Sequence, residues 1–177
     1  MLLLAQREAI SRVWGQSGID ATLARLPDDV REATDHARVV GWYPTRYMVA
    51  WHDAVMRGPA GADETSFRAY IDSAVDVTFA RLQRAVMRIA TPKLLLERGT
   101  RLWRSAHTHG STTLTTIEAG LAHFEFRDHP FIESQTGRLA FAEVVRHILS
   151  LCATDVRESH ALRNGALAMT LQWRAGS

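Results

Sequence analysis

Residues 91–127 read TPKLLLERGTRLWRSAHTHGSTTLTTIEAGLAHFEFR, and within this stretch the chain changes from a helical pattern to a strand pattern. Thr91-Pro92 is typical of a helix start, because threonine caps free N–H groups and proline at the first helical position loses no hydrogen bond. After Gly110, residues 111–117 are nearly all β-branched and residues 121–127 alternate. The alternation predicts a hairpin with Ala122, Phe124 and Phe126 on one face and His123, Glu125 and Arg127 on the other.

Upstream of this stretch, the pattern is helical. Residues 2–26 predict two helical pieces broken near Gly15 to Gly18, and residues 27–36 and 45–56 predict two more helices. Residues 67–89 carry apolar side chains at three and four spacing, which predicts a long, central, buried helix. The helical part is expected to extend to about residue 108.

Downstream, residues 136–152 predict an amphipathic helix that packs on the sheet, and residues 155–174 predict a second hairpin. Its turn is Asn164-Gly165, the pair preferred in a type I′ turn. With these two residues as the loop, one face pairs Leu162 with Leu167, His160 with Met169, Glu158 with Leu171 and Val156 with Trp173. This face is predicted to be the core face.

The order of elements predicts the α+β class, with N-terminal helices followed by two antiparallel β-hairpins flanking an amphipathic helix. At 177 residues with 46% hydrophobic content, the chain is large enough to bury a core without disulfides or metal. We expect a single α+β domain over residues 1–177, with a helical part of about 1–108 and a hairpin-helix-hairpin part of about 111–174.

Composition limits the possible settings and partners. The one cysteine, Cys152, is interpreted as a small buried apolar residue, and its being single favours a reducing compartment. No apolar run reaches the length that spans a bilayer, so a cytoplasmic location is expected. The formal charge is only +2 and no reader motif is present, so no nucleic-acid partner is expected.

No HExxH, GxSxG, Walker-type or GxGxxG motif occurs, so no catalytic residue is assigned and a non-enzymatic role is favoured. Histidine at the end of a helix is commonly structural. A single histidine in an apolar pocket can nevertheless hold haem iron. The candidate haem ligands are His52, His107 and His109.

The predicted hairpin register places Glu158 and His160 among apolar side chains. A buried carboxylate destabilises the fold unless it has partners. The two residues therefore form either a mutually satisfied pair or the polar lining of a small-molecule pocket, which combines apolar walls with a few polar groups. The candidate lining residues are Trp103, Glu158, His160, Met169 and Trp173.

Several stretches carry a family resemblance: Leu26-Pro27 with residues 28–31, Trp42-Tyr43-Pro44, Thr91-Pro92 with residues 94–98, Leu102-Trp103-Arg104 and Leu171-Gln172-Trp173. The order of elements resembles the ligand-binding domains of the 4-vinyl reductase type and the related subunits of TRAPP vesicle-tethering complexes. The stretches themselves resemble a bacterial family with many paralogues in myxobacteria, some grouped with haem-nitric-oxide sensors. The 4-vinyl reductase pattern has cysteines in the last hairpin where this chain has His160, Ala166 and Ala168, so no metal is expected.

The resemblance and the residues together predict a regulatory or sensory domain that binds a small apolar or amphipathic ligand, or a protein partner. A homodimer is expected from the pairing habit of TRAPP-like folds and from the large apolar residues, which include five tryptophans. No cofactor is expected. The alternatives are a haem or gas sensor with a histidine axial ligand and a pure interaction scaffold like the TRAPP subunits.

Overall fold

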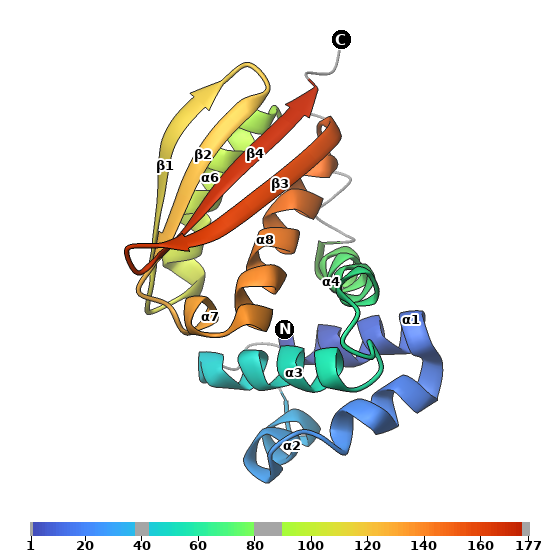
Figure 1. Cartoon of the computed structure of the whole chain (residues 1–177). Coiled ribbons are helices and arrows are strands. Elements are labelled where there is room, and N and C mark those ends of the chain that lie inside the picture. Colours follow the sequence, from blue (N-terminus) through green and yellow to red (C-terminus); the bar gives the residue numbers. More distant parts are fainter. Residues whose placement is uncertain (1, 38–42, 80–89, 175–177) are drawn as a thin grey trace. The chain divides into compact units, whose positions relative to one another are not determined.

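The computed structural model describes residues 2–37, 43–79 and 90–174, and the chain divides into two compact units, Met1–Ala80 and Arg81–Ser177. Each unit is described by itself (Figure 1). Whether the two units together form one domain stays a prediction. The model confirms the predicted α+β class, with helices in both units and strands in the second.

The first unit is helical. It contains α1 (Leu2–Leu23), α2 (Asp28–Asp35), α3 (Thr45–Arg57) and α4 (Glu64–Phe79). The predicted break in the first segment is confirmed, because Gly15 interrupts α1 with φ 67° and ψ −158°. Of the predicted helix over 67–89, residues 67–79 are helical, and residues 80–89 lie outside the described residues.

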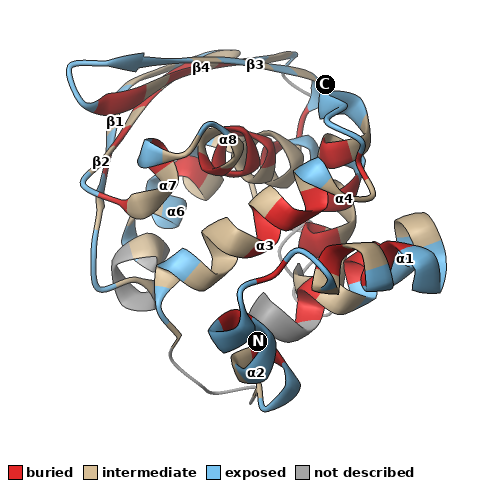
Figure 2. Cartoon of the chain, turned by 60° about the horizontal axis from the view of Figure 1, so that its bottom comes forward, coloured by how far each residue is buried: buried red, intermediate tan, exposed pale blue. Residues whose placement is uncertain are grey.

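Large side chains fill the interior of the first unit, which appears as buried faces on α1, α3 and α4 in Figure 2. Trp51 on α3 is fully buried, and its Nε1 donates a hydrogen bond to Thr34 Oγ1 on α2 at 3.2 Å. Phe67 and Tyr70 on α4 are also fully buried. These residues pack three helices together. Each helix has an apolar face, as the spacing of apolar residues in its sequence predicts.

The second unit begins with α6 (Pro92–Ala106), and Leu94 N–H donates to the capping Thr91 Oγ1 at 3.2 Å. The helix start that residues 91–92 predict is therefore confirmed. The remaining elements are β1 (Ser111–Glu118), β2 (Leu121–Arg127), α7 (Pro130–Glu133), α8 (Gln135–Ser150), β3 (Thr154–Arg163) and β4 (Ala166–Arg174). Both predicted hairpins and the helix between them are confirmed, whereas the four-residue α7 was not predicted.

The four strands form one antiparallel sheet in the order β1-β2-β4-β3. Asn164 and Gly165 have φ values of 49° and 72°, as a type I′ turn requires, and they set the predicted register of the second hairpin. The pairs Leu162 with Leu167, His160 with Met169 and Glu158 with Leu171 are all present. A register irregularity between Thr154 and Arg157 replaces the predicted pairing of Val156 with Trp173.

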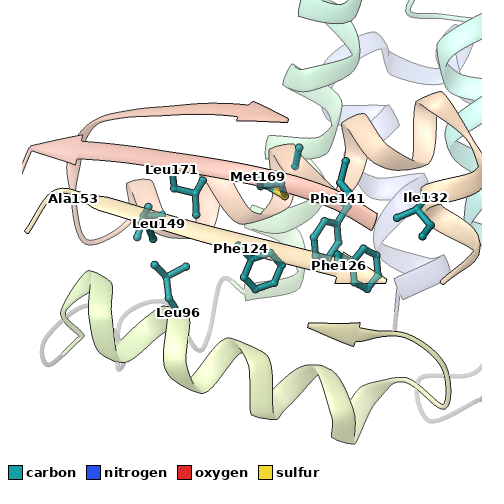
Figure 3. Packing of buried hydrophobic residues seen from close by; sticks show 12 residues of the cluster. Leu96, Phe124, Phe126, Ile132, Phe141, Leu149, Ala153, Met169 and Leu171 are labelled. Carbon is teal, nitrogen blue, oxygen red and sulfur yellow. The ribbon is translucent and has the colours of Figure 1, made fainter. Parts of the chain in front are cut away.

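The core of this unit lies between the inner face of the sheet and helices α6 and α8 (Figure 3). Phe124 and Phe126 of β2 pack there with Phe141 of α8, and Leu96 of α6 belongs to the same cluster. The predicted core face of the second hairpin is wrong at Leu162, which is 53% exposed. Leu162 lies two residues from the turn, on an edge strand with no further described strand beside it, so neighbouring side chains cover it poorly.

Candidate functional site

Five aromatic and imidazole rings meet where α6 ends: Trp103, His107, Phe126, His129 and Phe141. We call them the ring cluster. The His107 ring stacks on Trp103, with centroids 3.6 Å apart and an interplanar angle of 6°. Trp103 meets Phe126, His129 and Phe141 edge to face at 4.8, 5.0 and 5.4 Å. The cluster thus joins α6, β2, the turn before α7, and α8, and Figure 3 shows its Phe126 and Phe141 in the core.

Local backbone geometry places His107 and His129 in this cluster. His107 follows the end of α6 with an extended backbone (φ −132°, ψ 140°), so its ring is not fixed by helical geometry. Asp128 has a positive φ of 56°, which ends β2 and turns the chain toward His129 and Pro130. Proline at the start of α7 then follows His129, the capping residue of that helix.

Both histidines are neutral at pH 7. Burial lowers the pKa of His129 to about 4, and charge repulsion from the nearby His107 and His109 adds to this shift. Burial also lowers the pKa of His107. The Phe131 backbone N–H donates to Nδ1 of His129 at 3.3 Å, so the single proton of that neutral ring is assigned to Nε2.

Three polar atoms around Phe126 are buried and have no hydrogen-bond partner within the described ranges: Trp103 Nε1, His129 Nε2 and Thr112 Oγ1. Thr112 faces Phe126 across the β1–β2 ladder. Trp103 Nε1 and His129 Nε2 each carry a hydrogen, so both are donors. Buried donors in native proteins are nearly always paired, so these two mark the ring cluster as unusual.

His52 lies in the other unit, on α3. Its ring contacts Phe67 and Tyr70 edge to face at 6.0 and 6.2 Å, and burial lowers its pKa to about 4. Burial also raises the pKa of the Tyr70 phenol, whose hydroxyl donates to Gln6 Oε1. His52 is therefore a neutral imidazole enclosed by aromatic side chains.

His109 is exposed, and its Nδ1 lies 2.7 Å from Thr108 Oγ1. Of the three histidines that the sequence singles out, only His107 is both half-buried and part of a ring cluster. Within the described residues, no group of three or more histidine, cysteine, aspartate or glutamate side chains is arranged to hold a metal ion.

Glu158 and His160 form a pair on β3, with His160 Nδ1 3.0 Å from Glu158 Oε2. The Glu158 side chain is 4% exposed and that of His160 is 22% exposed. The predicted contact between them is therefore present. Their role in ligand binding, like that of Trp103, Met169 and Trp173, stays a prediction.

Two shallow depressions border the second hairpin. His160 and Met169 help line one of about 460 Å³, and Trp173 helps line another of about 330 Å³. Trp103 and Glu158 line neither, so these two depressions do not gather the five candidate lining residues in one place.

Replacing His160 by leucine removes the 3.0 Å partner of a carboxylate that is 4% exposed. We expect this change to lower the free energy of unfolding by about 1–3 kcal/mol. Replacing both residues by leucine should cost less than the two single changes added together, because no carboxylate then remains buried. Urea unfolding of the wild type, the two single variants and the double variant measures this coupling. Losses that simply add would show that Glu158 and His160 do not stabilise each other.

His129 is the residue that the sequence reading missed. The sequence carries a signal for it in the run Asp128-His129-Pro130, directly after the strand predicted over residues 121–127. The same run also fits a capping residue followed by proline at the first position of a helix. Cys152 was predicted to be buried and is half-buried; burial raises the pKa of its thiol, which disfavours the reactive thiolate.

No family model matches the chain, and no curated protein matches it either. Solved structures do match. The Fe(II) unliganded H-NOX protein of K. algicida superposes with a TM-score of 0.70 at 7% identity, over 99% of this chain and 96% of that one. An oxygen-binding H-NOX domain related to soluble guanylate cyclases superposes with a TM-score of 0.65 at 9% identity, over 96% and 91%. The chain therefore has the fold of the H-NOX (haem-nitric oxide/oxygen binding) domains.

A third solved structure of this fold, from work that probes haem distortion in the H-NOX family, has a TM-score of 0.65 at 10% identity, over 99% of this chain and 94% of that one. The expectation that the chain needs no cofactor is therefore wrong, because it ignored that known proteins of this fold bind haem. The relation to 4-vinyl reductases and TRAPP subunits, in contrast, stays a prediction. No helix of the described residues is long and apolar enough to cross a membrane.

Proposed function

We propose that the chain is a sensory domain that binds haem, and that His107 is the residue that would hold the iron. The fold supports the proposal, because the solved structures that share it include Fe(II) and oxygen-binding H-NOX proteins. The observation that carries it for this chain is the state of His107, a half-buried neutral imidazole beside a wall of aromatic rings.

The donor chemistry of His107 fits haem iron. A histidine ligand must be neutral, because the ring nitrogen that binds iron needs its lone pair. Burial lowers the pKa of His107, so this condition is met at pH 7. Its extended backbone beyond α6 also allows side-chain rotamers that a helical backbone would exclude.

The other two candidates fit less well. His52 is 4% exposed, so the helical unit would have to open before iron could reach its ring. His109 is exposed and lacks apolar surroundings. Bound haem would supply an iron that takes up a small gaseous ligand. The chain itself would contribute the neutral ring of His107 and the apolar side chains that exclude water.

The proposal is tested by supplying haem to the purified chain and recording its absorption spectrum. We expect a Soret band that shifts when carbon monoxide is added to the reduced protein. In the His107→Gly variant the band should be lost, and free imidazole should restore it by taking the place of the missing ring. The His109→Ala variant is the control and should keep the band.

Each result has a separate meaning. A wild-type chain that takes up no haem overturns the proposed function. A band that survives in His107→Gly but is lost in His52→Ala keeps the function and overturns the choice of ligand. The predictions of a homodimer and of a cytoplasmic location stand apart from this test and stay predictions.

A further inference from the structure

Strand β3 is an open edge of the sheet in the described part of the chain. The strand order β1-β2-β4-β3 leaves β1 and β3 at the two edges, as Figure 1 shows. A register shift between Leu114 and Thr116 interrupts β1, and an irregularity of this kind hinders the addition of another strand. In contrast, β3 keeps a regular register from Arg157 to Arg163. Of the two edges, β3 is therefore the better template for a further strand.

The hairpin turn determines which backbone groups of β3 point away from β4. In a hairpin with a two-residue loop, the residues that flank the loop form a hydrogen-bonded pair, and such pairs alternate along the ladder. Arg163 and Ala166 flank this loop, so the N–H and C=O groups of His160 and Leu162 point to the open side. Within the described ranges, neither backbone has a hydrogen bond on that side. An extended peptide can form main-chain hydrogen bonds with such a row of groups.

An exposed leucine lies on the same edge. Leu162 is 53% exposed, and no other large apolar side chain of the described residues is exposed. An apolar residue of an added strand, placed opposite Leu162, would cover this side chain, and the burial of apolar surface would stabilise the pairing. The edge therefore favours a strand that carries an apolar residue at this position.

The outer face of β3 carries two positive charges. Arg157 and Arg163 lie on the face of the sheet opposite the core, and both are exposed. On the neighbouring strands, Arg127 and Arg174 each form an ion pair with a carboxylate, whereas neither arginine of β3 does so among the described residues. Opposite charges directly across a strand pair stabilise it. Acidic side chains opposite Arg157 and Arg163 would supply the missing partners.

A second copy of this chain fits the edge poorly. Two copies of β3 could pair antiparallel over the whole regular stretch, with His160 opposite itself. Arg157 would then face Arg163 of the second copy, and like charges directly opposite each other destabilise a strand pair. An acidic segment of another protein has the complementary charge, so the observations favour it as the occupant.

We infer that β3 is the docking site for an extended, acidic segment of a partner protein, which adds to the sheet as a further strand antiparallel to β3. The pairing predicts an acidic residue opposite Arg163, an apolar residue opposite Leu162 and a second acidic residue opposite Arg157. None of these contacts involves haem, so the inference goes beyond the proposed function.

The probe is the synthetic peptide Glu-Leu-Thr-Val-Thr-Thr-Glu, which follows this pattern when it lies antiparallel to residues 157–163. The matched peptide has lysine in place of both glutamates. Fluorescence anisotropy of the dye-labelled peptides measures their binding to the full chain without haem. We expect the glutamate peptide to bind about tenfold more tightly than the lysine peptide.

Amide hydrogen exchange, followed by NMR, shows where the peptide binds. Exchange should slow at His160 and Leu162 in the complex, because new main-chain hydrogen bonds protect these two amides. Ala161 is the internal control. Its N–H already points to β4, so its exchange should change less.

Reversing the two charges tests the recognition of the acidic residues. The double variant Arg157→Glu/Arg163→Glu should bind the glutamate peptide about tenfold more weakly and should prefer the lysine peptide, a reversal that misfolding would not produce. Arg98→Glu, at an exposed position on α6, is the control and should bind as the wild type does. Leu162→Pro removes one N–H on the open side and leaves the ladder to β4 intact, so it should also weaken binding.

The inference is overturned if neither peptide binds, if both bind equally well, or if the charge-reversed variant keeps the preference for the glutamate peptide. Binding without slower exchange at His160 and Leu162 also contradicts strand addition. Light scattering of the chain alone tests the other occupant, because a dimer that dissociates in Leu162→Pro would place a second copy on the edge. Peptide binding by a chain that shows no Soret band with haem removes the proposed function and keeps the docking site.

Discussion

The chain should lose stability steeply as the pH falls from 7 to 4, because two buried histidines are neutral in the folded protein. Burial lowers the pKa of both His52 and His129 to about 4, from the ordinary histidine value of 6.5. Between pH 7 and pH 4 the unfolded chain binds protons that the folded chain does not bind. The free energy of unfolding therefore falls as the pH falls. The contribution is fully present above pH 6.5 and is lost as the pH approaches 4.

The expected size follows from the same pKa difference. Each histidine should lower the free energy of unfolding by about 2 kcal/mol at pH 5 and by about 3 kcal/mol at pH 4. Urea unfolding at pH 7, 6 and 5 measures this slope before most carboxylates titrate. Because His129→Asn keeps the helix cap, it should remove the part of the slope that His129 contributes. Unchanged stability between pH 7 and 5 would show that neither ring is held neutral by the fold.

A single methyl group at Gly137 should destabilise the second unit strongly. A Cβ at this position would lie 2.5 Å from the carbonyl oxygen and 2.9 Å from the Cα of Phe131. Both are backbone atoms of α7, so no side chain can rotate to make room. Overpacking of this kind costs about 2–3 kcal/mol, and the better helix preference of alanine offsets only part of it.

Gly99 provides the matched control. It lies exposed on α6, where a Cβ would meet nothing within 4 Å. Gly99→Ala should therefore raise the free energy of unfolding by up to about 1 kcal/mol through helix preference alone. Urea unfolding followed by circular dichroism compares the two variants. Equal stability of Gly137→Ala and Gly99→Ala would contradict the close approach of α7 and α8.

Gly137→Ala should also disturb the ring cluster. The change pushes against Phe131, whose N–H donates to Nδ1 of His129. A displaced α7 would release the tautomer that presents Nε2–H. The variant is thus expected to change the surroundings of His129 as well as the free energy of unfolding.

Local signals in the sequence were sufficient to predict most of the helices and strands that the structure describes, α7 excepted. Thr91-Pro92 predicted the start of α6, and its side-chain cap is present. The alternation over residues 121–127 predicted which side chains of β2 face the core, and Asn164-Gly165 predicted the register of the last hairpin. These features depend on hydrogen bonds and side-chain directions within a few residues, so the sequence determines them without reference to the rest of the fold.

Only the tertiary structure decided which chemical groups meet. Trp103, His129 and Phe141 come from three separate elements, and no spacing in the sequence relates their side chains. The lowered pKa of His129 and the lack of a partner for its Nε2 among the described residues depend on burial, to which every element packed around the ring contributes. Leu162 shows the same limit: its register was predicted correctly, but its exposure was set by its place on an edge strand beside the turn.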